Sequence, residues 1–200
     1  LTVYASPDRS LIVSVSGVGK LNAALTVAHG LGPLSERDHA SFLNVGIAAS
    51  SEFSVGECVL VNKVIDAATR QVWYPFLTQR LKASTAPVWC YDVPQAIIKN
   101  PLLDMESAGF MQAVSRLACQ DQAQIIKVVS DNCAEDQIAI KPENVTAWLS
   151  DSMPVIQATI DQLLDRSAFA LESHVEFEEY DSIVSRWHFT VYQQHQLKGF

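Results

Sequence analysis

Several stretches of this chain predict strands that are apolar on both faces, and this feature restricts the fold most. Residues 41–49 (SFLNVGIAA) and 124–131 (QIIKVVSD) are the clearest examples. Both faces of such a strand must be covered, because neither can be left in water. Segments with helical spacing of apolar residues alternate with these strands. The pattern predicts an α/β fold in which helices cover a largely parallel or mixed sheet.

Local patterns divide the chain into alternating strands and helices. Strands are predicted over residues 2–5, 10–16, 41–49, 57–66, 88–93, 102–105 and 124–131, and helices over residues 21–31, 106–119, 146–165 and 174–197. Pro154 has no N–H to donate, so it is expected to kink or restart the third helix. No internal repeat or low-complexity linker interrupts this order. We therefore expect residues 1–200 to form a single domain.

The composition restricts the class of partner. The 200 residues carry a formal net charge of −8, so the chain offers no basic stripe to neutralise the phosphates of a nucleic acid. Its longest apolar stretches, such as residues 11–15, are too short to span a bilayer. Small-molecule ligands remain open as partners.

Cysteines and histidines show no pattern typical of a metal centre. The four cysteines are Cys58, Cys90, Cys119 and Cys133. They form no CxxC pair, which favours free thiols in a reducing cytosol. His188 and His195 lie seven residues apart on a predicted helix, but no carboxylate or cysteine completes a site with them. No export signal is present. We expect a cytoplasmic protein with no metal ion and no cofactor.

A glycine-rich turn, SGVGKLNAA at residues 16–24, joins a predicted strand to a predicted helix. Free backbone N–H groups at such a turn can meet an anion or a ligand oxygen. The turn is not a Walker loop, because Leu21 follows Lys20 where Ser or Thr belongs. It is not a dinucleotide fingerprint either, since Asn22 stands in place of the third glycine. Taken alone, the pattern favours a structural turn over a ligand loop.

Carboxylates follow two predicted strands at their C-terminal ends, where ligands bind in open α/β sheets. Glu106 in DMESAGF (104–110) could accept hydrogen bonds from paired hydroxyls, or Asp104 or Glu106 could cap the following helix. Asp131 in VVSDNCAED (128–136) could act as a general acid, although an Asx turn or cap is the commoner role of Asp there. We expect the two strands to be neighbours in the sheet, which would bring both carboxylates into one pocket.

Four motifs, in the order SGVGKLNAA, NVGIAAS (44–50), DMESAGF and VVSDNCAED, resemble the nucleoside phosphorylase superfamily. Among its members they are most similar to the methylthioadenosine/S-adenosylhomocysteine nucleosidases, over residues 3 to 165. The resemblance implies a single-domain three-layer α/β sandwich with a central mixed sheet, assembled as a homodimer or higher homo-oligomer. It also implies cleavage of the N-glycosidic bond of a purine nucleoside through an oxocarbenium-like transition state.

The resemblance assigns a role to each motif residue. Asp131 would protonate or hydrogen-bond N7 of the departing purine, and Ser130 would help to orient it. Glu106 would bind the ribose hydroxyls, with Met105 packed against the sugar. Val18 would lie near the 5′ substituent.

The chain also departs from the family pattern. Ile47 replaces the serine of the NVGIAAS loop, and Lys127 replaces the arginine before the VxSD motif, and both are expected at the ligand. Residues 63–100, which in the family carry a purine-stacking phenylalanine, are shortened. The family's first strand, followed by the glutamate that holds the attacking water, is expected to be absent. Residues 166–200 are expected to form a helical extension.

These departures leave two functional classes open. The first is a purine nucleosidase, and the alternative is a nucleoside-binding or structural homologue that has lost hydrolysis. A phosphate-dependent phosphorylase is less favoured than hydrolysis, because residues 44–50 contain no arginine for phosphate.

Overall fold

The computed structural model describes residues 1–7, 10–31, 40–77, 83–95, 99–118, 120–132, 140–172, 180–191 and 193–194. The chain divides into two compact units, Leu1–Ala168 and Phe169–Phe200. The second unit contains the helix α5 (Tyr180–Arg186), which covers only part of the helix predicted over residues 174–197. His195, Cys119 and Cys133 lie outside the described residues.

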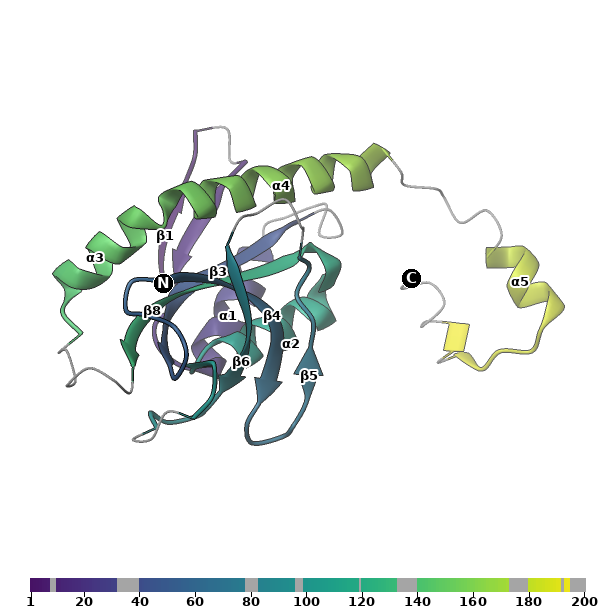
Figure 1. Cartoon of the computed structure of the whole chain (residues 1–200). Coiled ribbons are helices and arrows are strands. Elements are labelled where there is room, and N and C mark those ends of the chain that lie inside the picture. The colour runs from purple at the N-terminus through teal and green to yellow at the C-terminus, as the bar shows by residue number, and fades with distance from the viewer. Residues whose placement is uncertain are drawn as a thin grey trace. The chain divides into compact units, whose positions relative to one another are not determined.

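A six-stranded mixed sheet forms the centre of the first unit (Figure 1). Its strands are β3 (Phe42–Ser50), β4 (Cys58–Asp66), β5 (Val72–Trp73), β6 (Ser84–Cys90), β7 (Leu102–Asp104) and β8 (Ala123–Asn132). Their order is β5-β4-β6-β7-β3-β8. The pairs β3–β8, β4–β6 and β6–β7 are parallel, while β3–β7 and β4–β5 are antiparallel. The predicted mixed sheet is therefore confirmed.

The sheet also closes on itself. The first residues of β4, Cys58–Leu60, pair antiparallel with Ile126–Val128 of β8. The central layer is thus a closed barrel rather than the open sheet of a simple sandwich, because this pairing joins two strands from opposite parts of the strand order. Closure leaves neither β4 nor β8 as a free edge along these residues.

Helices cover both faces of this sheet. They are α1 (Lys20–Leu31), α2 (Ser107–Leu117), α3 (Pro142–Asp151) and α4 (Met153–Glu172). Val59, Val61 and Ile125 belong to a core cluster that includes residues of α1 and α2. Leu60 and Ile126, which alternate with them along the same strands, pack instead with Ile156 of α4. This alternation explains why the strands are apolar on both faces.

Pro154 lies at the boundary between two consecutive helices. The predicted helix over residues 146–165 is two helices, α3 and α4, which are separated at Ser152. Pro154 is the second residue of α4, so the predicted restart is confirmed. Within the described ranges, no helix combines the length and the apolarity needed to cross a bilayer.

A separate two-stranded hairpin precedes α1. Its strands, β1 (Thr2–Ala5) and β2 (Ile12–Val15), correspond to the two strands predicted over residues 2–5 and 10–16, and they pair antiparallel. Gly17 and Gly19 have φ angles of +78° and +103°, so the turn from β2 into α1 uses the left-handed region that favours glycine. This turn carries Val18, one of the predicted ligand residues.

Candidate functional site

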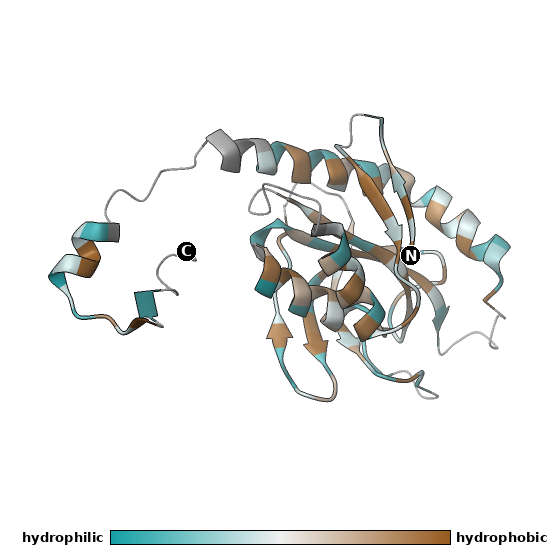
Figure 2. Cartoon of the chain, turned by 180° about the vertical axis from the view of Figure 1, so that it is seen from behind, coloured by the Kyte–Doolittle hydropathy of each residue, from teal (hydrophilic) through white to brown (hydrophobic). Residues whose placement is uncertain are grey.

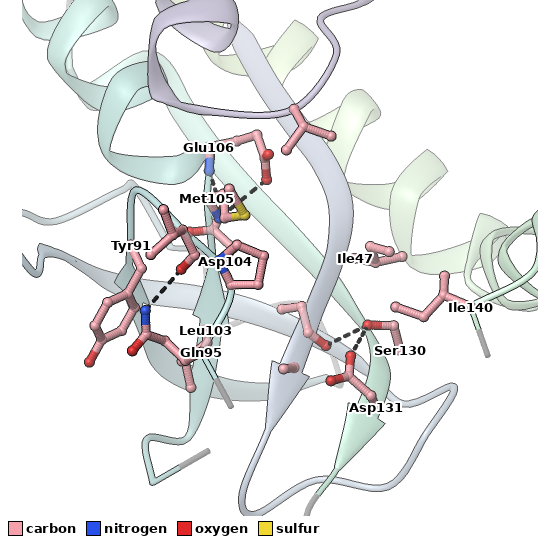
Figure 3. A pocket seen from close by; sticks show the side chains of 15 residues that line it. Ile47, Tyr91, Gln95, Leu103, Asp104, Met105, Glu106, Ser130, Asp131 and Ile140 are labelled. Atoms are coloured by element: carbon pink, nitrogen blue, oxygen red, sulfur yellow. Dashed lines mark hydrogen bonds between the residues drawn. The ribbon is translucent and has the colours of Figure 1, made fainter. Parts of the chain in front are cut away.

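A cavity of about 280 Å³ lies beside the C-terminal ends of the strands (Figure 3). Its lining comes from the turn before α1, from β3, from the segment after β6, from the end of β7 and from the end of β8. The predicted site residues Val18, Ile47, Met105, Glu106, Ser130 and Asp131 all belong to this lining. The fold therefore brings together motifs that are far apart in the sequence.

The two carboxylates reach this cavity from strands that are not neighbours. The strand β3 lies between β7, which precedes Glu106, and β8, which carries Asp131. The expectation that these strands are adjacent is therefore wrong, yet both side chains line the cavity. Figure 3 shows Glu106 at one end of it and Asp131 at the other.

The sequence left open which of Asp104 and Glu106 caps the following helix and which can accept hydrogen bonds from a ligand. Asp104 caps the start of α2, because its Oδ2 accepts hydrogen bonds from the backbone N–H of Ser107 (2.8 Å) and from its Oγ (2.5 Å). The side chain of Glu106 makes no capping hydrogen bond. Its Oε1 instead accepts the backbone N–H of Gly19 at 2.8 Å. The glycine-rich turn and the DMES segment thus meet at the carboxylate of Glu106.

A close approach of two helices makes this contact possible. A Cβ atom added to Gly109 in α2 would lie 2.0 Å from the carbonyl oxygen of Lys20, the first residue of α1. Only a glycine at this position lets the α1 backbone come so near, which places the neighbouring Gly19 N–H against Glu106. The glycine-rich turn is therefore structural, as its pattern favours, and also part of the cavity wall through Val18.

Lys20, which follows the same turn, forms salt bridges with residues at the ends of two strands. Its Nζ lies 3.0 Å from Asp66 Oδ1 at the end of β4 and 2.9 Å from Asp92 Oδ1 after β6. Burial works against the charge of Lys20, but hydrogen bonds to Asp92 and Asp66 outweigh it and raise its pKa. Burial likewise opposes the charge of Asp66, but Lys20 and two backbone N–H groups lower its pKa.

A bulge in β8 directs both Ser130 and Asp131 toward the cavity. Ala48 pairs with Val129 and Ala49 with Asp131, so Ser130 is an extra residue without a partner on β3. Ser130 Oγ lies 2.5 Å from Asp131 Oδ1 and 3.3 Å from the carbonyl oxygen of Ala48. Its hydroxyl can donate to either oxygen, which orients the Asp131 carboxyl group.

Lys127 is the one predicted ligand residue that does not line the cavity. Its side chain is completely buried, and its Nζ lies 2.9 Å from Asp104 Oδ2, which is buried to the same degree. Burial opposes ionisation of Asp104, but the charge of Lys127 and the hydrogen bonds from Ser107 outweigh it and lower the pKa. Lys127 thus faces Asp104 rather than the cavity.

Sequence reasoning missed part of the lining. Tyr91, Val93, Pro94 and Gln95 follow β6 and line the cavity, as does Ile140. The signal was present, because the predicted strand over residues 88–93 runs into polar and proline residues at its C-terminal end. Ligands bind at the C-terminal ends of strands in α/β sheets, so the end of this third strand could also have been predicted to line the site. Ile140 has no comparable signal.

The weaker candidates stay outside the site. His188 is exposed in the second unit. Cys58 and Cys90 are free thiols, and burial raises the pKa of each. No group of His, Cys, Asp and Glu side chains in the described part of the chain could hold a metal ion.

Comparisons with known proteins identify the same fold. The sequence matches no protein-family model and no curated protein. A methylthioadenosine/S-adenosylhomocysteine nucleosidase from Colwellia psychrerythraea 34H, solved with adenine, is 20% identical with a TM-score of 0.57, over 78% of this chain and 80% of that one.

Two structures from Helicobacter pylori agree with this result. A methylthioadenosine/S-adenosylhomocysteine nucleosidase bound to butyl-thio-DADMe-Immucillin-A is 12% identical, with a TM-score of 0.62 over 80% of this chain and 83% of that one. A futalosine hydrolase mutant is 11% identical, with a TM-score of 0.57 over 82% and 83%. The mixed α/β fold with a central mixed sheet that the motif resemblance implies is thus confirmed, although the sheet is closed. At these identities the likeness concerns the fold.

Proposed function

We propose that this chain cleaves the N-glycosidic bond of a purine nucleoside of the methylthioadenosine or S-adenosylhomocysteine type. One observation carries the proposal: Glu106 and Asp131, with Met105 and Ser130 beside them, line a single cavity. The likeness in fold to nucleosidases that were solved with purine ligands supports the same reaction class.

Glu106 is the ribose ligand in this proposal. Its Oε1 already accepts the Gly19 N–H, and its Oε2 accepts the Met105 N–H at 3.4 Å. The remaining lone pairs of both oxygens can accept hydrogen bonds from the ribose hydroxyls. The hydrogen bond from Gly19 also fixes the direction of the carboxylate. An ionised carboxylate at this place stabilises the positive charge that develops on the sugar as the bond breaks. Met105 packs against the sugar.

Asp131 is the general acid. The C1′–N9 bond breaks with its electron pair moving to the purine, and a proton from Asp131 to N7 neutralises that charge. In the structure the Ser130 hydroxyl lies within hydrogen-bonding distance of Asp131 Oδ1, which turns the other carboxyl oxygen toward the base. A water molecule then forms the new C–O bond at C1′ of the cationic sugar and releases one proton to the solvent, from which Asp131 is reprotonated after the base leaves.

Hydrolysis fits the cavity better than phosphorolysis. Among the described residues that line it, none is a lysine or an arginine, and the only charged lining groups are acidic. A phosphate ion would meet repulsion from the ionised Glu106, and no described lining residue supplies a cation to offset it.

The alternative is a homologue that binds a nucleoside without hydrolysing it. The observation that favours it is Ile47, an apolar residue of the cavity wall at the position where the family has serine. An apolar side chain cannot hold a water molecule by hydrogen bonds.

The test follows release of free purine base from methylthioadenosine, S-adenosylhomocysteine, adenosine and inosine, with and without phosphate. We expect release without phosphate, and we expect Asp131→Asn to slow it by a factor on the order of 10² to 10⁴. If no substrate yields base and yet nucleosides raise the melting temperature, the non-hydrolytic alternative holds. If there is neither release nor a shift, both readings fail.

Assembly and location belong to the same proposal. Many exposed apolar side chains gather on the β1–β2 hairpin and α1, including Tyr4, Val13, Val15, Leu21 and Leu25, and Figure 2 shows brown residues along the hairpin. Large apolar patches of this kind typically mark interaction surfaces. We expect a homodimer or higher homo-oligomer in the cytoplasm. Light scattering should then give a mass at a multiple of 22.0 kDa.

A further inference from the structure

We propose that Lys127 is a positioning residue for the ribose end of the site. It holds Asp104, and Asp104 in turn holds the segment from Met105 to Ser107 that presents Glu106 to the cavity. The inference rests on the proposed function, because it concerns how the ribose-binding carboxylate is kept in place.

The ion pair between Lys127 and Asp104 is buried, and a glycine on the neighbouring strand leaves room for it. The side chains of Lys127 and Asp104 are both 0% exposed, with Nζ and Oδ2 separated by 2.9 Å. Gly46 of β3 is paired with Lys127 across the sheet. A Cβ atom at Gly46 would lie 3.2 Å from Nζ, so glycine leaves room for the ammonium group where the pair crosses β3.

One oxygen of Asp104 connects the ion pair to the turn. Oδ2, the atom nearest to Lys127, also accepts the N–H of Ser107 at 2.8 Å and its Oγ at 2.5 Å. The N–H of Glu106 lies 3.4 Å from the same oxygen. The ammonium of Lys127 therefore keeps ionised the carboxylate on which the backbone around Glu106 is anchored.

Removing the ammonium would leave an unpaired buried carboxylate. Such a group takes up a proton or moves toward water, because burying an uncompensated charge is unfavourable. Either change removes acceptor capacity from Oδ2 and loosens the turn. Glu106 would then lose its alignment with the ribose hydroxyls, while Asp131, which is held separately by Ser130, would keep its own.

Because only the ribose end of the site should be disturbed, the quantity to measure is the ratio of kcat/KM for adenosine to kcat/KM for 2′-deoxyadenosine. The ratio reports contacts with the ribose hydroxyl. We expect Lys127→Met to lower it by roughly tenfold to a hundredfold relative to the unmodified protein, and Lys127→Arg, which keeps the charge, to retain most of it. Asp131→Asn serves as the matched control, because it should slow both substrates equally and leave the ratio unchanged.

Folding is checked by circular dichroism and the thermal midpoint. A folded Lys127→Met protein with an unchanged ratio would overturn the inference, and so would a folded Lys127→Arg protein that behaves like Lys127→Met. If Lys127→Met does not fold, Ser107→Ala replaces it, since this change removes only the Oγ hydrogen bond to Asp104. An unchanged ratio in Ser107→Ala would then contradict the inference, and a partial decrease would support it.

The failure of the proposed function can be told apart from the failure of this inference. If the unmodified protein releases no base, the same comparison is made from the melting-temperature shifts that adenosine and 2′-deoxyadenosine produce. Equal shifts in the unmodified protein would exclude Glu106 as the ribose ligand. Unequal shifts that persist in folded Lys127→Met would exclude only the role of Lys127.

Discussion

At the scale of single residues, two carboxylates only two positions apart have entirely different surroundings. Asp104 ends a buried strand, is paired with Lys127 and caps α2. Glu106 lies beyond the strand, where its carboxylate meets a backbone N–H of the glycine-rich turn and the cavity. Oδ2 of Asp104 is engaged by Lys127 and by two hydrogen bonds from Ser107, whereas the carboxylate of Glu106 retains hydrogen-bonding capacity for a ligand.

Glu106→Gln tests the charge of the ribose ligand. The carbonyl oxygen of Gln can still accept the Gly19 N–H, so the turn should keep its place and the thermal midpoint should hardly change. Loss of the negative charge removes electrostatic stabilisation of the cationic sugar. We expect kcat/KM for base release to fall by a factor on the order of 10² to 10³.

Glu143→Gln is the control for this change, because Glu143 is an exposed residue in the first turn of α3 and outside the cavity lining. It should leave base release unaltered. Equal activity in Glu106→Gln and Glu143→Gln would exclude a catalytic contribution from the Glu106 charge.

At the scale of elements, the crossing of α1 and α2 sets the geometry of the ribose end. The two helices meet where Gly109 faces the backbone of Lys20. Gly19, one residue earlier, supplies the N–H that Glu106 accepts. Helix packing and ligand geometry are therefore coupled through one residue without a side chain.

Gly109→Ala should lower the free energy of unfolding by about 1–3 kcal/mol, because the new methyl group would overlap the carbonyl group of Lys20. The helices must separate, which also moves Gly19 away from Glu106 and should weaken nucleoside binding. Urea unfolding and ligand-induced melting shifts measure the two effects.

Gly30→Ala provides the matched control. Gly30 lies in α1, and a Cβ atom there meets nothing within 4 Å. Replacing a helical glycine by alanine should raise the free energy of unfolding by up to about 1 kcal/mol. If Gly109→Ala proved as stable as Gly30→Ala, the close approach of the two helices would not hold in solution.

The elements themselves were largely predictable. Residues 41–49, 57–66 and 124–131 correspond closely to β3, β4 and β8, because a run of apolar residues reports burial directly. By contrast, β6 begins at Ser84 rather than at residue 88, and β5 was not predicted. The start of β6 contains polar residues and Pro87, and β5 has only two residues, so neither has a local pattern of its own.

At the scale of the whole molecule, Lys20 joins the start of α1 to the ends of β4 and β6 through Asp66 and Asp92. The pKa of Lys20 is raised from 10.5, so its contribution to stability is present below 10.5 and is lost as the pH rises through the raised value. The pKa of Asp66 is lowered from 3.8, so its contribution is present above 3.8 and is lost as the pH falls through the lowered value.

Lys20→Met should therefore reduce the free energy of unfolding by on the order of 1 kcal/mol, and this difference should hold between about pH 4 and pH 10. It should shrink outside that window. Urea unfolding of both proteins from acid to alkaline pH measures it, with the exposed Lys141→Met as the control. A difference that stays constant at both extremes would show that charge is not its cause.

The sequence by itself determined the α/β class, the order of most elements and the residue types at the strand ends, because these depend on local periodicity and turn chemistry. It could not determine which carboxylate pairs with a lysine and which accepts a hydrogen bond from the glycine-rich turn. That depends on contacts such as Gly19 with Glu106, which are 87 residues apart, and on Lys127 with Asp104 across an intervening strand.

Tertiary structure alone also decided that the sheet closes and that β3 separates the two strands whose ends carry the site. The physical reason is the same in both cases. Strand order and helix crossing are set by how complete elements fit together in three dimensions, as at Gly109, where only a missing side chain permits the contact with the backbone of Lys20. Local sequence patterns do not predict this packing.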